Sequence, residues 1–161
     1  MSDLINNTEV TEDAQKGRFL AFLIGSEAYG IEIKYVTEII GIQSVTEMPE
    51  MPSYVKGIIN LRGRIIPLID IRLRFGKEAR EYDDRTCVIV VGINTFSYGL
   101  IVDSVFEVLS IPDEDTSPLP EINMTATNKF IKSIGKTSSG IVLIVDCEKL
   151  LTPDDIGEIS A

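Results

Sequence analysis

Residues 28–42, AYGIEIKYVTEIIGI, return as residues 97–111, SYGLIVDSVFEVLSI, and this internal duplication is the strongest indication of the fold. Five of the fifteen aligned positions are identical, and four more exchange one aliphatic residue for another. A weaker echo aligns residues 54–70, YVKGIINLRGRIIPLID, with residues 130–146, FIKSIGKTSSGIVLIVD. Internal similarity of this kind predicts a chain built from two related small units.

Each unit is predicted to begin with a β-hairpin. In the first unit, RFLAFLI and AYGIEI read as antiparallel strands joined by a turn at residues 25–27. In the second unit, TCVIVVGI and FSYGLIV flank a turn near Asn94. The segments that follow, KYVTEII and DSVFEVL, fit either one short helix or an irregular strand, because runs this short are compatible with both periods.

The closing run of each unit is predicted to be a buried strand. IIPLID ends in Asp70 and IVLIVD ends in Asp146, and each carboxylate is placed to cap a short final helix. Paired units of about 65 residues with short strands and glycine bends predict an all-β protein made of two small barrels, with a few short helices. A parallel α/β fold is disfavoured, because no amphipathic helix of a dozen or more residues separates the strands.

The predicted organisation is one domain with two tails. Residues 1–16 are polar and are expected to form a flexible N-terminal tail. Residues 17–151 form the domain, with the first barrel at roughly 17–80 and the second at roughly 81–151, a pattern that is compatible with strand exchange between them. Residues 152–161 form a C-terminal tail.

The composition argues against several classes of function. Fifteen basic and twenty-five acidic residues give a net charge of −10, which repels nucleic-acid phosphates and anionic lipid headgroups. No apolar run approaches the roughly 18 residues of a membrane span, and the acidic first residues lack the pattern of a signal peptide. We therefore expect a globular cytoplasmic protein that neither binds nucleic acid nor inserts into a membrane.

Few side chains in the sequence are suited to catalysis or to binding a metal or cofactor. Histidine is absent, which removes the usual neutral-pH base, zinc ligand and phosphate acceptor. Cys87 and Cys147 lie beside apolar runs without CxxC spacing, so we expect reduced, buried thiols. The glycines form no nucleotide-binding loop, and the acidic run 113–115 lacks the later glutamate of a calcium loop. No cofactor or metal site is predicted.

Three aspartates raise one enzymatic alternative. Asp70, Asp103 and Asp146 could supply a pair of carboxylates, as in glycoside or peptide hydrolysis. Asp70 and Asp146 occupy matching positions, however, where helix capping is sufficient, and no DTG or DSG signature accompanies any of the three. We predict no catalytic residue, and a carboxylate-based hydrolase is the alternative from a different class.

The turn NLRG, residues 60–63, is the most distinctive feature that the second unit lacks. Asn60 and Gly63 tolerate positive φ, so we predict a hairpin tip that holds the Arg62 guanidinium out toward solvent. The second unit has KTSS at residues 136–139, so the fold does not need an arginine here. Arg62 is therefore either a solvated turn residue or a recognition residue, a role for which its planar fork is well suited.

The block VKGIINLRGRIIPLIDIRLRFG resembles the CheW family, the small coupling proteins of bacterial chemotaxis. The similarity extends from about Arg18 to Leu151 and includes YGIEI followed by VTEII, the run YGLIVDSVFEVL and the LxLP-like segment 117–120. The central block is long enough to be specific, whereas NLRG alone would not be. The resemblance implies two SH3-like five-stranded β-barrels packed around a common hydrophobic core.

The resemblance also implies a function without catalysis. Members of this family are adaptors that join the cytoplasmic tips of methyl-accepting chemoreceptors to the histidine kinase CheA, whose regulatory domain has the same fold, and so help to assemble signalling arrays. The chain would be recruited to membrane receptor arrays through these partners. The closest alternative is a coupler of another motility array, for twitching or gliding, and nothing in the residues separates the two.

Two sets of positions follow from the resemblance. A groove between the barrels would receive the receptor's helical hairpin, although aliphatic residues at this spacing also fit a plain core position, and Glu38 a solvated or structural one. The receptor positions are Ile33, Val36, Glu38, Ile39, Arg62, Val105 and Val108. End surfaces of the barrels would contact the kinase, and the positions there are Val45, Gly57, Ile65, Glu121 and Ile122.

Overall fold

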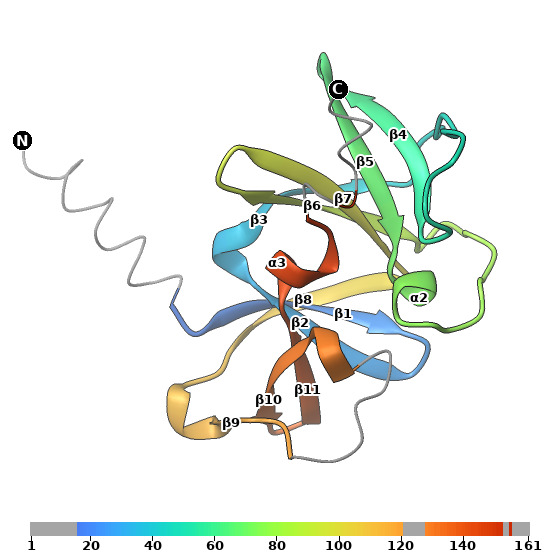
Figure 1. The fold of residues 1–161 in the computed structure, drawn as a ribbon. Coiled ribbons are helices and arrows are strands. Elements are labelled where there is room, and N and C mark those ends of the chain that lie inside the picture. The colour runs from blue at the N-terminus through green and yellow to red at the C-terminus, as the bar shows by residue number, and fades with distance from the viewer. Residues whose placement is uncertain (1–15, 121–127, 153–154, 156–161) are drawn as a thin grey trace, which may run out of the picture.

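Two bent β-sheets make up the molecule (Figure 1). The structure is a computed structural model that describes residues 16–120, 128–152 and 155. Sheet A has the strand order β8 (Ser104–Ser110), β1 (Arg18–Ile24), β2 (Glu27–Glu32), β11 (Gly140–Val145), β10 (Ile131–Thr137) and β9 (Thr116–Ser117). Sheet B has the order β3 (Val36–Gly41), β6 (Cys87–Ile93), β7 (Phe96–Val102), β5 (Arg64–Asp70) and β4 (Val55–Leu61).

Each sheet contains strands from both sequence repeats. Sheet A joins β1 and β2 of the first unit to β8, β9, β10 and β11 of the second, and sheet B joins β3, β4 and β5 of the first unit to β6 and β7 of the second. The two first hairpins are therefore exchanged, and they meet their new sheets through the parallel pairs β2–β11 and β5–β7. A division near residue 80 separates the repeat units but does not separate the sheets.

Three hydrophobic clusters explain how the sheets pack. The largest, called here the common core, draws buried residues from both sheets and both short helices. Sheet B encloses a second cluster and sheet A a third. Each sheet thus curls into a small SH3-like barrel around its own apolar residues, and the two barrels share the common core, as predicted. Burying a Leu, Ile or Phe side chain contributes about 1.5–3 kcal/mol, so the shared cluster fixes the barrels against each other.

The segments that the sequence left ambiguous are strands. A single 3₁₀ turn, η1 (Ile33–Tyr35), precedes β3, whereas β8 follows β7 almost directly. Both strands are edges of their sheets, and each carries a β-bulge at the same repeat position, at Thr37 in β3 and Phe106 in β8. Bulges on edge strands disrupt the row of free backbone groups and so protect the edge from unspecific pairing.

The predicted helix caps are confirmed. Asp70 accepts a hydrogen bond from the backbone N–H of Arg72 and begins α2 (Ile71–Arg74). Asp146 accepts one from Glu148 and begins α3 (Cys147–Leu150). Two further 3₁₀ turns, η2 (Asp113–Asp115) and η3 (Asn128–Phe130), precede β9 and β10. Within the part of the chain that the structure describes, no helix is long and apolar enough to cross a bilayer.

Candidate functional site

The first candidate surface begins on the edge strand β3. Val36 stands opposite Val91 of β6, and Ile39 stands opposite Ile89. Directly opposed residues of antiparallel strands point to the same face of a sheet. Because Val91 and Ile89 belong to the common core, Val36 and Ile39 lie on the face of sheet B that looks toward it.

The edge strand β8 repeats this arrangement in sheet A. Val105 stands opposite Phe22 of β1, and Val108 stands opposite Leu20. Phe22 and Leu20 also belong to the common core, so Val105 and Val108 lie on the core-facing side of sheet A. These two valines and the two aliphatic residues of β3, all predicted receptor contacts, thus occupy equivalent places at the margins of the same core.

We call the residues Ile33, Val36, Ile39, Val105 and Val108 the seam residues. Ile33, Val36 and Val105 are partly buried against the common core. Ile39 and Val108, which are repeat mates, leave 44% and 41% of their surfaces exposed. An exposed aliphatic residue retained in both units has apolar surface that a partner can cover, with a gain of about 1 kcal/mol for each side chain.

Arg62 lies close to these strands, and its guanidinium has a partner on one of them. Its guanidinium donates hydrogen bonds of 2.6 and 2.8 Å from Nη1 and Nη2 to the two carboxylate oxygens of Glu38. The side chain is 71% exposed, in agreement with a guanidinium held out toward solvent at a hairpin tip. Arg62 and Glu38, both predicted to contact a receptor, form one bidentate unit.

The turn that carries Arg62 is a two-residue hairpin tip, as predicted. Arg62 and Gly63 have φ angles of +53° and +85°, the pattern of a type I′ turn. Asn60 has no such angle and contributes in another way, because its Oδ1 accepts a hydrogen bond from the N–H of Gly63 at 2.8 Å. This bond fixes the tip and so directs Arg62 toward β3.

The ion pair shifts the pKa of both partners. The hydrogen bond from Arg62 lowers the pKa of Glu38 below its ordinary value, and it raises the pKa of Arg62. Glu38 therefore stays ionised in mildly acidic solution. Its repeat mate Glu107 has no such neighbour, since Ser138 stands where the first unit has Arg62, and no ion pair within residues 16–120 and 128–152 involves Glu107.

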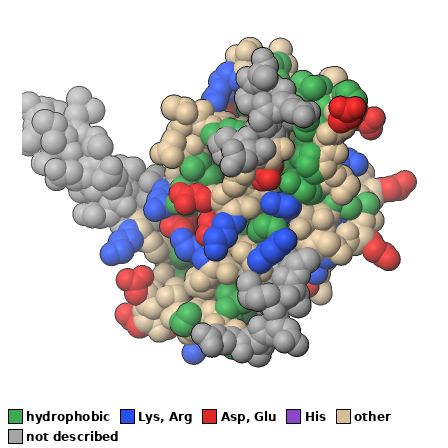
Figure 2. Space-filling view, viewed as in Figure 1, with side chains coloured by type: hydrophobic (Ala, Val, Ile, Leu, Met, Phe, Trp, Pro, Cys, Tyr) green, Lys and Arg blue, Asp and Glu red, His purple; other side chains and the backbone are tan. Residues whose placement is uncertain are grey.

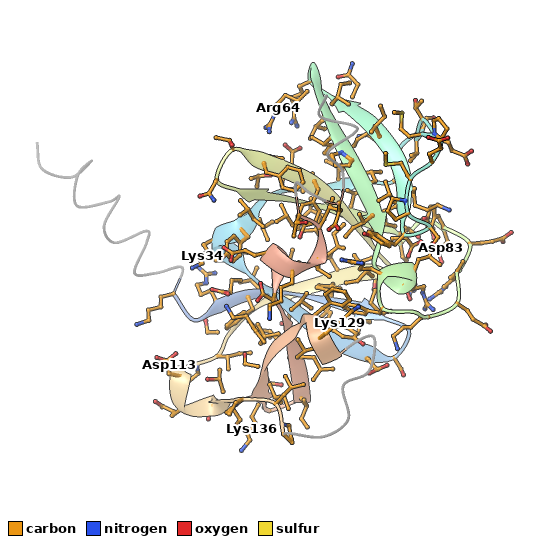
Figure 3. All side chains as sticks on the ribbon, in the orientation of Figure 1. Lys34, Arg64, Asp83, Asp113, Lys129 and Lys136 are labelled. Carbon is orange, nitrogen blue, oxygen red and sulfur yellow. The ribbon has the colours of Figure 1, made fainter. Side chains whose placement is uncertain are left out.

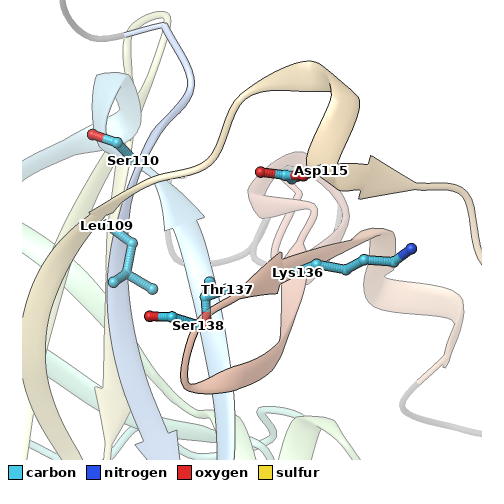
Figure 4. A pocket seen from close by; sticks show the side chains of 6 residues that line it. All are labelled: Leu109, Ser110, Asp115, Lys136, Thr137 and Ser138. Atoms are coloured by element: carbon cyan, nitrogen blue, oxygen red, sulfur yellow. The ribbon is translucent and has the colours of Figure 1, made fainter.

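A shallow hollow occupies the equivalent place in the second barrel. Figure 4 shows Leu109 and Ser110 of β8 on one side of it and Thr137 and Ser138 of the β10–β11 tip on the other. Its volume is about 410 Å³, and Asp115 and Lys136 complete its wall. In the first barrel the ion pair of Arg62 and Glu38 spans the gap between the hairpin tip and the edge strand. In the second barrel the corresponding gap is the open hollow.

The predicted kinase positions divide into three groups. Val45 and Gly57 are adjacent, because the backbone of Thr46 pairs with Ile58 through two hydrogen bonds of 2.9 Å. Gly57 has a structural reason to be glycine, since a Cβ there would lie 2.2 Å from the carbonyl oxygen of Thr46. Ile65 is 56% exposed on β5. Glu121 and Ile122 lie outside the described residues.

The aspartates of the hydrolase alternative all serve the fold. Asp70 also accepts a hydrogen bond of 2.8 Å from the Tyr82 hydroxyl, and Asp103 accepts hydrogen bonds from Arg72 and Arg80. Asp70 and Asp146 cap their helices through backbone amides. These contacts show no pair of converging carboxylates, and within the described ranges no three His, Cys, Asp or Glu side chains are grouped to hold a metal ion.

Sequence reasoning missed two features of the surface. The Glu38 partner of Arg62 was not foreseen, although glutamate at both repeat positions with arginine at only one was a usable signal. Phe106 was not singled out, yet this residue is 45% exposed at the bulge of β8. Its repeat mate Thr37 instead donates its hydroxyl to the carbonyl of Val90.

Comparison with known proteins gives a consistent result. The family model of the CheW-like domain matches residues 18–154. The chain is 35% identical over 156 residues to the chemotaxis protein CheW of Klebsiella aerogenes, covering 97% of this chain and 94% of the relative. It is 36% identical over 137 residues to the chemotaxis protein CheW of Helicobacter pylori, covering 85% and 82%.

A solved structure and a more distant relative extend the comparison. The crystal structure of the scaffolding protein TtCheW from Thermoanaerobacter tengcongensis matches with a TM-score of 0.77 and 35% identity, over 84% of this chain and 88% of that one. Protein FrzA of Myxococcus xanthus is 26% identical over 102 residues, 63% of this chain and 64% of the relative. The chain belongs to the CheW family of non-catalytic chemotaxis scaffold proteins.

Proposed function

We propose that this protein is a chemotaxis adaptor that couples methyl-accepting chemoreceptors to the histidine kinase CheA and helps to assemble their arrays. It performs no chemistry and acts by holding two partners at once. The observation that carries the proposal is the pair of edge strands, one from each barrel, that present matching aliphatic residues at the margins of one rigid core. Family membership supports the same function.

The seam residues are the proposed receptor surface, with Arg62 and Glu38 beside them. A helical hairpin offers apolar residues three and four apart along one face, and these suit a strip of aliphatic side chains. Arg62 and Glu38 add a polar pair at the rim that can exchange its mutual hydrogen bonds for bonds to the receptor. The rigid common core then carries any displacement of one barrel to the other.

The proposed kinase surface lies at the β4–β5 end of sheet B. Ile65 supplies an exposed aliphatic side chain there, and Val45 packs beneath against the barrel interior. Val45, Gly57 and Ile65, with Glu121 and Ile122, are the proposed kinase contacts. Separate surfaces on one body allow receptor and kinase to bind together, and this is the requirement for a coupler.

The proposal is tested by reconstitution with receptor-containing membranes, purified CheA and ATP. We expect the kinase to autophosphorylate faster in the presence of receptor only when this protein is added. Ile65→Asp should abolish that stimulation and weaken binding to the kinase, while binding to the receptor is kept. A protein that leaves kinase activity unchanged at saturating concentration would refute the proposal.

Ile141 provides a matched control. It is the repeat mate of Ile65 on β11 and is 63% exposed, so Ile141→Asp introduces the same charge on an equivalent strand. We expect this variant to stimulate the kinase like the unmodified protein. Equal loss of activity in the Ile65 and Ile141 variants would show that the effect is general and that Ile65 is not a specific contact.

The second candidate function is coupling in another motility array, and the similarity to FrzA favours keeping it. The two candidates share surfaces and differ only in partners. Capture from a lysate of the source bacterium, followed by peptide identification of the retained kinase and receptors, separates them. In either case we propose a cytoplasmic protein held at membrane arrays by its partners.

A further inference from the structure

The repeat creates two equivalent corners in the molecule. Each combines the tip of a first hairpin, the second residue of a short capped helix, and a residue just before an edge strand. The first corner consists of Gly25, Arg72 and Asp103, and the second consists of Asn94, Glu148 and Lys34. Both tip residues have positive φ, +62° for Gly25 and +56° for Asn94, so the backbones correspond in conformation as well as in sequence.

The first corner is closed by an internal arginine. Asp103 accepts hydrogen bonds from Nε and Nη2 of Arg72, at 2.9 and 2.5 Å, and from the backbone N–H of Gly25, at 2.7 Å. The side chains of Arg72 and Asp103 are only 17% and 13% exposed. The arginine thus spans the space between the helix and the hairpin tip.

The second corner has the opposite charges and cannot close in this way. Lys34 replaces the aspartate, and an ammonium cannot accept a hydrogen bond from the N–H of the tip. Lys34 instead pairs with Glu32 at 3.6 Å and is 58% exposed, at the position labelled in Figure 3. Glu148, in place of the arginine, is exposed, and the bond that it accepts is a long one of 3.4 Å from the Tyr35 hydroxyl.

This part of the surface is strongly charged. Glu32 pairs with both Lys34 and Lys132, and one carboxylate against two ammonium groups leaves this group with an excess of positive charge. Figure 2 shows acidic and basic side chains gathered near the middle of this face. Within the residues that the structure describes, neither lysine forms an ion pair with Glu148, whose carboxylate accepts the long hydrogen bond from Tyr35.

A hollow of about 330 Å³ lies between the hairpin tip and α3 at the second corner. Among the residues that the structure describes, its lining comprises one carboxylate, one amide, one hydroxyl and three apolar side chains, and no basic residue. The lining residues are Ile93, Asn94, Thr95, Phe96, Glu148 and Leu151. Its volume is near the lower bound of small-ligand sites, roughly 300 Å³.

We propose that this hollow binds an arginine side chain presented by a partner protein. The guanidinium would pair with the carboxylate of Glu148, and the methylene stem would pack against Ile93, Phe96 and Leu151. Two observations favour arginine. The hollow combines a negative charge with apolar walls, which suits a cation on an apolar stem, and the equivalent corner is filled by Arg72 within the chain itself. The proposal does not depend on the identity of the receptor or the kinase.

The test is an amide NMR titration of the ¹⁵N-labelled full chain with N-acetyl-arginine amide. We expect saturable shifts in residues 93–96 and 148–151, with millimolar affinity because a single side chain supplies the contact. The isosteric neutral probe N-acetyl-citrulline amide should bind about fivefold more weakly, since it lacks the charge. Equal shifts with both probes, or shifts spread over all acidic residues, would overturn the proposal.

Two variants with a matched control complete the test. Glu148→Gln should lower the affinity for the arginine probe about fivefold. Glu114→Gln, the same charge change at an exposed residue of η2, should leave that affinity unchanged. The double variant Lys34→Asp with Glu148→Arg reproduces the charges of the first corner and should abolish binding. Binding of the arginine probe that survives in the double variant, which lacks the Glu148 carboxylate, would also overturn the proposal.

Discussion

Arg62 and Glu38 join the two ends of sheet B. Glu38 lies on the edge strand β3, and Arg62 lies at the tip of the hairpin formed by β4, the opposite edge, and β5. Their two hydrogen bonds connect strands that share no backbone ladder. The pair therefore closes the first barrel at the same place where it presents a charged fork to solvent.

The pKa of Glu38 should report this contact directly. Arg62→Ala removes the hydrogen bond that lowers it, so we expect the pKa to rise toward the ordinary value of 4.5. The measurement is a ¹³C NMR titration of the glutamate carboxyl groups. Arg64→Ala is the control, because Arg64 acts on Glu38 only as a more distant charge and should change its pKa less. An unchanged pKa in Arg62→Ala would show that the pair does not persist in solution.

Arg62→Asp should separate function from stability. The substitution places a second carboxylate beside Glu38 and removes the fork, yet the side chain is on the surface, so we expect the melting temperature to be nearly unchanged. In the reconstituted assay, receptor-dependent kinase activation should be abolished. Undiminished activation would remove Arg62 from the proposed receptor surface.

Stability in acid should depend on Asp103. Burial alone would raise its pKa, but the hydrogen bonds from Arg72 and from the backbone of Gly25 outweigh that effect and lower it. A lowered folded-state pKa stabilises the protein above the unfolded-state value, roughly 3.9, and this stabilisation is lost as the pH falls toward the folded-state pKa.

We therefore expect Asp103→Asn to reduce the free energy of unfolding at pH 7 by about 2 kcal/mol. The difference from the unmodified protein should shrink below about pH 4, as measured by urea unfolding across the pH range. Asp113→Asn, at an exposed residue of η2, is the control and should cost little. If the difference in unfolding free energy between Asp103→Asn and the unmodified protein were independent of pH, the stabilisation would not come from the ionised Asp103 carboxylate.

Gly57 should resist substitution for a structural reason. Its φ of +148° is unfavourable for other residues, and a Cβ would lie 2.2 Å from the Thr46 carbonyl oxygen. We expect Gly57→Ala to destabilise the protein by about 3 kcal/mol in chemical unfolding. Gly63→Ala, with φ of +85° but open space around it, should cost only about 1 kcal/mol. Similar costs at both sites would show that the segment around Thr46 moves aside.

Local features of the fold were predictable because they depend on neighbours in sequence. Hairpins follow from alternating apolar runs around a turn, and the caps at Asp70 and Asp146 follow from an acidic residue at the end of a strand. The duplicated stretch predicted two equivalent units, and the aliphatic residues that it shares do lie in equivalent places on β3 and β8.

Long-range partners were not predictable in the same way. The exchange of the first hairpins depends on which sheet each one joins, and the same alternating pattern would serve either sheet. The bond between Arg62 and Glu38 connects residues 24 positions apart through the closure of a barrel. The open second corner depends on reversed charges at Lys34 and Glu148. The sequence does not show that these two residues lie at one corner, because they come from distant parts of the chain that only the fold brings together.

The proposed receptor surface is tested most directly by calorimetric titration of the protein with a fragment of the receptor's cytoplasmic hairpin. Val108→Asp places a charge on an exposed seam residue of β8, and Ile141→Asp places the same charge on exposed β11. We predict that Val108→Asp weakens binding at least about tenfold, because it buries an unpaired carboxylate, and that Ile141→Asp leaves the affinity unchanged. Equal affinities for the hairpin in the two variants would contradict the proposed surface.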